Sequence, residues 1–246
     1  MIHMPLVAAA VCPHPPLLVP ELAAGAAAEL DDLRTACVTA VDRLVGAADR
    51  VVVVGGGPRT ANHHGRGSFA RYGVPRTVLL SGQDQPDGPS TAEPPLSLLV
   101  GFWLLQQAAP GPDGGGPAVR GQAVAADAAP QACAALGRDL AAVPARVGLL
   151  VMGDGSACRG VRSPGYDDPR AEPFDAAVAG ALARADVPAL LSLDPALARQ
   201  LQAAGRAPWQ VLAGAAQATG GPWRGTVTYQ AAPYGVAYLV ACWEPA

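Results

Sequence analysis

Three short apolar runs restrict the possible folds of this chain more than any other feature. They lie at Pro5–Val11, Val51–Val54 and Val147–Met152, and glycine or proline follows each run within two residues. A continuous apolar run of this length, bounded by such residues, is typical of a strand that is buried on both faces. Since both faces of such a sheet must be covered, the runs predict a central sheet with helices on each side.

Segments with helical spacing of apolar residues alternate with these strands. The spacing predicts helices at Glu21–Val45, Leu96–Ala108, Pro130–Ala142, Phe174–Ala185, near Pro195–Ala204 and at Trp209–Ala218. Further strands are predicted at Thr77–Leu80, Val119–Ala126, Thr226–Gln230 and Val236–Trp243. The alternation predicts one three-layer α/β/α domain over residues 1–246, with a largely parallel sheet. Segments rich in proline and glycine near 82–95 and 109–118 are predicted to be flexible loops.

Composition excludes several classes of protein. Half of the 246 residues are apolar and 15% are charged, so a large core is expected and a disordered chain is not. The net charge is −3 and no basic stripe occurs, which argues against a nucleic-acid partner. No apolar segment is long enough to span a membrane, and the N-terminus does not resemble a signal peptide. The five cysteines are scattered without CxxC spacing, so a cytoplasmic protein is expected.

A histidine directly after the first predicted strand is the leading candidate for a functional residue. The sequence there is Val11-Cys-Pro-His-Pro-Pro16, and its prolines end the strand because they fix φ and lack an N–H. His14 is therefore expected on a stiff loop at the carboxyl edge of the sheet, where open α/β sheets bind ligands. Its imidazole could be a metal ligand or an acid/base group, or it could bond a backbone carbonyl in a purely structural role.

Two other strand ends carry polar groups and should converge on the same edge. His63 and His64 follow the second strand, as candidate metal ligands or as residues of a solvated loop, and Asp154 follows the 147–152 strand. The segment Gly55–Thr60 also places Gly-x-Gly after a strand, which would suit a nucleotide. That pattern is weak, because threonine replaces the third glycine and a proline stands where a phosphate-binding helix should begin.

Four motifs in the expected order resemble one known family. They are Pro13–Glu21, Gly153–Ala157, Pro164–Asp175 and Pro233–Tyr238. They are similar to signatures of the class III extradiol dioxygenase (LigB-like) superfamily, and most of all to its Memo-like, AmmeMemoRadiSam-associated branch. The resemblance implies an α/β/α fold and a non-haem Fe(II) held by two histidines and a carboxylate, with catechol and dioxygen as substrates. It also implies a further histidine as acid/base.

Most of the family's site residues are replaced in this chain. The resemblance retains His14 as the first ligand, but Gly56 stands in the place of the second histidine. Ala157 stands in the place of the acid/base histidine, and Gln230 in that of the carboxylate. With Ser156, these residues are expected to line the ancestral cleft. The resemblance therefore implies the fold of a dioxygenase with a largely lost iron site.

Two main hypotheses follow. In the first, no cofactor is expected, and the cleft around His14 binds a small molecule, a protein partner or a second copy of the chain. In the second, the protein is an active metal-dependent dioxygenase or oxidoreductase with a rearranged site for Fe(II) or another divalent metal. Its ligands would be His14 with His63 or His64, together with Asp154 or Glu244, and Asp154 is also its candidate catalytic residue. Nucleotide binding through Gly55–Thr60 is a third hypothesis.

Overall fold

A computed structural model of the chain describes residues 6–79, 93–108 and 116–246. Most of the two segments predicted to be flexible, near 82–95 and 109–118, lies outside the described residues, as does Leu80 at the end of a predicted strand. No helix in the described part of the chain is long and apolar enough to cross a membrane.

The centre of the fold is a seven-stranded sheet in the order β3-β6-β2-β7-β1-β9-β8. Strands β6, β2, β7 and β1 run parallel, whereas β3 and the β9–β8 hairpin add antiparallel strands at the two edges. The bounds are β1 Leu6–Cys12, β2 Arg50–Gly57, β3 Ala61–His63, β6 Ala118–Ala125, β7 Val147–Met152, β8 Trp223–Ala231 and β9 Tyr238–Pro245. A separate two-stranded sheet pairs β4, Arg66–Ser68, with β5, Thr77–Leu79.

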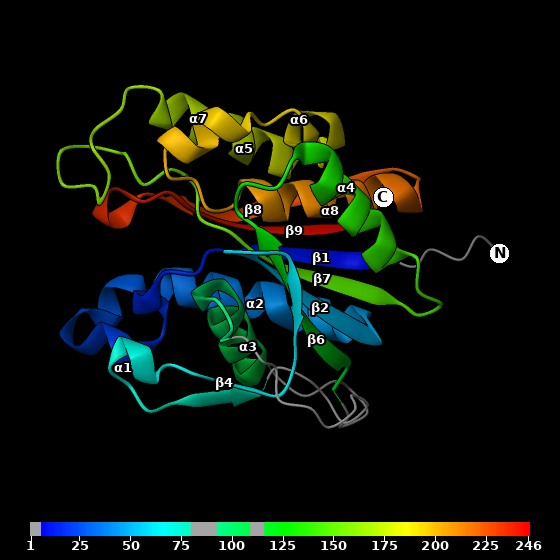
Figure 1. Ribbon diagram of the computed structural model, residues 1–246, viewed down its shortest axis with the longest axis horizontal. Coiled ribbons are helices and arrows are strands. Elements are labelled where there is room, and N and C mark those ends of the chain that lie inside the picture. The colour runs from blue at the N-terminus through cyan, green and yellow to red at the C-terminus, as the bar shows by residue number, and fades with distance from the viewer. Residues whose placement is uncertain (1–5, 80–92, 109–115) are drawn as a thin grey trace.

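Helices cover both faces of the large sheet (Figure 1). One face carries α1, Pro20–Ala23, α2, Asp31–Ala47, and α3, Leu96–Gln107. The other face carries α4 Pro130–Ala141, α5 Ala171–Ala183, α6 Val187–Leu191, α7 Pro195–Gln200 and α8 Arg206–Thr219. The predicted α/β/α architecture with a largely parallel sheet is therefore confirmed.

The four valines of β2 show why its apolar run has no polar interruption. Val52 and Val54 belong to the core beneath α8, while Val51 and Val53 belong to the core beneath α2 and α3. All four side chains are fully buried, because successive side chains of a strand point to opposite faces and both faces are covered here.

Several predicted boundaries were wrong. The helix predicted over Glu21–Val45 is broken into α1, a 3-10 segment at Ala24–Leu30, and α2. Ala24 has a φ of 46°, which ends α1, and the guanidinium of Arg34 donates to the backbone carbonyl of Ala27 and so holds the turn. The five-residue helix α6 was not predicted, nor were the short strands β3 and β4 in the expected polar loop.

Candidate functional site

The chain leaves two neighbouring central strands toward opposite faces of the sheet. After β1 it continues to α1 and α2 on one face, and after β7 it continues to α5 on the other (Figure 1). The two strands are paired at their last residues, Cys12 with Met152. Such a divergence is the position at which open α/β sheets bind ligands. The fold therefore places the residues directly beyond β1 and β7 at the sheet edge where such folds bind ligands, and this position is called the crevice below.

His14 and Asp154 meet at this crevice, each two residues beyond its strand. The backbone N–H of His14 donates to Asp154 Oδ1 at 2.7 Å, while the ring Nδ1 is 3.6 Å from the same oxygen. That Nδ1 atom is buried and has no hydrogen-bond partner among the described residues. A buried polar atom is costly to leave unsatisfied, so a bonding partner for this Nδ1 is expected.

His63 lies far from this pair. It belongs to β3 and is buried, so the prediction of a solvated loop is wrong for this residue. Its register runs across the sheet through Gly121, Val53 and Leu150 to Ala10 of β1. Four strand spacings amount to roughly 19 Å. His63 and His14 therefore cannot bind the same metal ion.

His64 directly follows His63 and so starts from the same distant edge of the sheet. The metal sites predicted from His14 together with either of these histidines are wrong. Strand β3, which holds His63 at the edge of the sheet, was not visible in the sequence, because it is only three residues long.

Glu244 lies at the opposite end of β1 from His14. Strand β9 runs antiparallel to β1 and pairs its Trp243 with Ala9, so Glu244 lies beside the first half of β1. Its exposed carboxylate forms an ion pair of 3.1 Å with Arg224. The prediction that Glu244 could join His14 is therefore wrong, since six residues of strand span roughly 20 Å.

The residues predicted to line the cleft have different surroundings. Gly56 and Ala157 offer no side-chain donor atom, and Gln230 is exposed on β8. Ser156 is completely buried, and its hydroxyl donates to Asp175 Oδ2 at 2.6 Å. Burial raises the pKa of the Asp175 carboxyl above its ordinary value. Ser156 therefore supports the loop after β7 from within the core and does not line the cleft.

The donor atoms at the crevice do not fit the family's iron site. A facial triad needs two imidazoles and a carboxylate around one ion. Only His14 and Asp154 meet there, and within residues 6–79, 93–108 and 116–246 no three His, Cys, Asp or Glu side chains are arranged to hold a metal.

The glycines after the second apolar run are part of a strand. Gly55–Gly57 extend β2 and pair with Ala123–Ala125 of β6, so the strand does not end at Val54 as predicted. A Cβ on Gly55 would lie 2.4 Å from Ser97 Oγ, which explains why a glycine is needed beneath α3. Since β3 and not a helix follows, the dinucleotide interpretation of Gly55–Thr60 lacks its strand–turn–helix context and is wrong.

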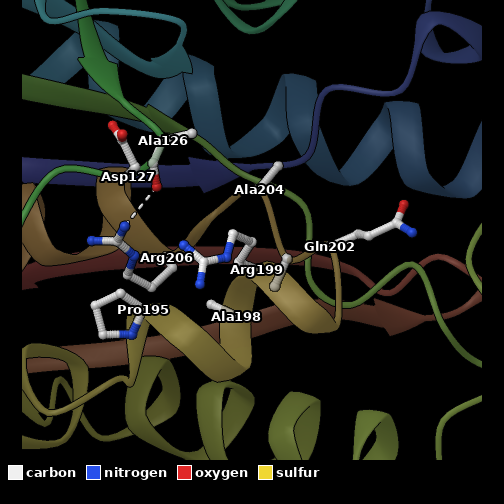
Figure 2. Close-up of a pocket in the computed structure, with 9 residues that line it drawn as sticks. Ala126, Asp127, Pro195, Ala198, Arg199, Gln202, Ala204 and Arg206 are labelled. Atoms are coloured by element: carbon white, nitrogen blue, oxygen red, sulfur yellow. Dashed lines mark hydrogen bonds between the residues drawn. The ribbon is translucent and has the colours of Figure 1, made fainter.

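A pocket with a volume of about 300 Å³ lies beyond the end of β6, beside the connection from α7 to α8 (Figure 2). It is lined by Ala126, Asp127, Pro195, Ala198, Arg199, Gln202, Ala203, Ala204 and Arg206. The connection is compact because α7 ends in a tight turn, with Gln202 at a φ of 53° and the Ala203 N–H donating to the Ala198 carbonyl.

Sequence analysis did not find this pocket. One signal was available: Arg206 stands in the first turn of α8, where the helix dipole disfavours a positive charge. The predicted start of that helix at Trp209 placed Arg206 outside it.

Comparison with known proteins supports the fold and leaves the function open. No known protein family matches the sequence, and no curated protein sequence matches it. The chain is similar to the crystal structure of the uncharacterized protein JW3007 from Escherichia coli K12, with a TM-score of 0.53 and 15% identity. The match covers 97% of this chain and 99% of that one, so the two share an overall α/β architecture.

Proposed function

We propose that this chain is a LigB-like, cytoplasmic binding protein that holds a small molecule in the cleft around His14 and does not cleave aromatic rings. The observation that carries the proposal is the buried Nδ1 of His14, without a hydrogen-bond partner among the described residues, at the crevice between β1 and β7. A ligand that bonds to this atom would satisfy it.

The replaced residues argue against ring cleavage. Gly56 and Ala157 stand where the family carries two histidines, and neither side chain can bind a metal or move a proton. Loss of an acid/base group alone typically lowers a reaction rate by about 10²–10⁴-fold. A cytoplasmic location agrees with the five cysteines, none of which forms a disulfide.

The imidazole signals of the protein provide a direct test. The chain has four histidines, so a ¹H–¹⁵N spectrum of the rings is simple, and His14→Ala assigns the signal of interest. We expect catechol, added without metal, to shift the His14 signal and to leave that of His63 in place, because His63 lies four strands away. With Fe(II) and air, we expect no oxygen uptake above that of a protein-free control.

Two results would contradict the proposal. One is catechol-dependent oxygen uptake that disappears in the His14→Ala variant, which would indicate a working metal site. The other is a His14 signal that catechol leaves unchanged at saturating concentration, which would remove the cleft as a binding site for this class of molecule.

A further inference from the structure

The pocket beside α8 contains a buried positive charge without a negative partner. Arg206 is 2% exposed, and its guanidinium donates to the carbonyls of Ala126 at 2.6 Å and Ala128 at 2.5 Å and to the Gln210 side-chain oxygen at 3.1 Å. These partners are all neutral. Among the described residues, no ion pair includes Arg206. A buried charge solvated only by dipoles favours an anion nearby.

A second guanidinium lines the same pocket. Arg199 extends from α7 over the pocket (Figure 2), and it makes no hydrogen bond or ion pair with any described side chain. Asp127 is the only acidic residue in the lining, so the two arginines leave a net charge of about +1. The start of α8, which no side chain caps, adds the positive end of a helix dipole.

We propose that this pocket binds a small organic carboxylate. The planar guanidinium of Arg199 matches the geometry of a carboxylate and can pair with both of its oxygens, while Arg206 supplies a fixed positive field. Alanine and proline side chains form the remaining walls, which suits an apolar body attached to the anionic group. A net charge of about +1 and apolar walls favour a monoanion over a phosphate dianion.

This pocket adjoins the cleft around His14, but its lining includes neither His14 nor Asp154. The segment Ala204–Gly205 lies between them, because Ala204 lines the pocket and the Gly205 N–H donates to the Asp154 carbonyl at 2.8 Å. The inference therefore does not depend on the proposed role of His14.

Benzoate titration tests the assignment, with neutral benzamide as the matched control ligand. At about 10 mM ionic strength, where charges act over about 30 Å, we expect saturable binding of one benzoate per chain. Benzamide should bind at least about tenfold more weakly, because it cannot form charge-assisted bonds with the guanidinium.

Arg199→Gln should weaken benzoate binding about tenfold, whereas Asp127→Asn should strengthen benzoate binding about threefold. Arg224→Gln, on β8 outside the pocket lining, serves as the control variant and should weaken benzoate binding far less than Arg199→Gln.

Equal affinities for benzoate and benzamide would overturn the assignment, as would the absence of saturable benzoate binding. Equal benzoate affinities of the Arg199→Gln and Arg224→Gln variants, or tighter binding of inorganic phosphate than of benzoate, would also overturn it. Loss of benzoate binding in His14→Ala, with Arg199→Gln unaffected, would move the ligand to the His14 cleft. That result would overturn the arginine pocket and leave the proposed function intact.

Discussion

Replacing Gly214 by alanine is expected to lower the free energy of unfolding by about 2–3 kcal/mol, because α4 and α8 touch backbone to backbone at this residue. A Cβ on Gly214 would lie 2.3 Å from the Ala134 carbonyl oxygen and 2.5 Å from its Cα. Gly137 of α4 is equally close to α8, with its Cβ position 2.1 Å from the Val211 carbonyl oxygen. Since backbone atoms cannot rotate away as a flexible side chain can, the helices must separate.

Gly46→Ala is the matched control for this substitution. Gly46 also lies in a helix, α2, but it is exposed and no atom lies within 4 Å of its Cβ position. Alanine there should stabilise the protein by about 0.5–1 kcal/mol, through helix preference alone. Urea denaturation of both variants gives the comparison. Equal stabilities of the two variants would show that α4 and α8 are not packed this closely.

Asp175→Ala is expected to lower the free energy of unfolding by about 3 kcal/mol, because it removes the acceptor of two buried donors of Ser156. Asp175 is 1% exposed, accepts from the Ser156 backbone N–H at 2.8 Å and also accepts from its hydroxyl. Ser156 is fully buried, so two donors would be left unsatisfied at about 1–3 kcal/mol each, partly offset by removal of a buried charge. Glu172→Ala, in the first turn of the same helix, removes only an exposed ion pair and should cost less than about 1 kcal/mol.

Asp175→Asn separates the hydrogen bonds from the charge. The amide oxygen can still accept from the Ser156 N–H, and the hydroxyl can turn to accept from the amide, so this variant should be much more stable than Asp175→Ala. Burial raises the pKa of Asp175 in the folded state, so the folded protein binds this proton more readily than the unfolded chain. The wild type should therefore gain stability relative to Asp175→Asn as the pH falls through the raised pKa. Urea denaturation between about pH 7 and pH 4 measures the difference, and the opposite slope would contradict a raised pKa.

The fold was largely predictable because both faces of the central strands are buried. The strand at Val147–Met152 was predicted with its correct bounds, since burial on two sides demands an unbroken apolar run. Prediction failed where tertiary contacts override local preference. Gly55–Gly57 continue β2 although glycine weakens strands, and at Gly55 the side chain of Ser97 on α3 approaches too closely for any other residue.

At the candidate site, sequence analysis correctly placed His14 and Asp154 at the same edge of the sheet, but it was wrong about His63, His64 and Glu244. Proline chemistry placed His14 at the carboxyl edge of the sheet, and strand order then decided which other residues could reach it. That order places β3 and β7 on opposite sides of β2, and it cannot be read from local sequence. Asp154 therefore lies with His14, whereas His63 does not. Arg199 and Arg206 converge through the turn after α7, which local spacing also does not reveal.

Iron stoichiometry tests the central claim most directly. The protein would be loaded anaerobically with excess Fe(II), desalted and assayed for metal, alongside His14→Ala as the matched control. Because only His14 and Asp154 meet at the crevice, we predict far less than one iron per chain, with the same value for both proteins. One iron per chain in the wild type, lost in His14→Ala, would contradict the account and indicate a working metal centre.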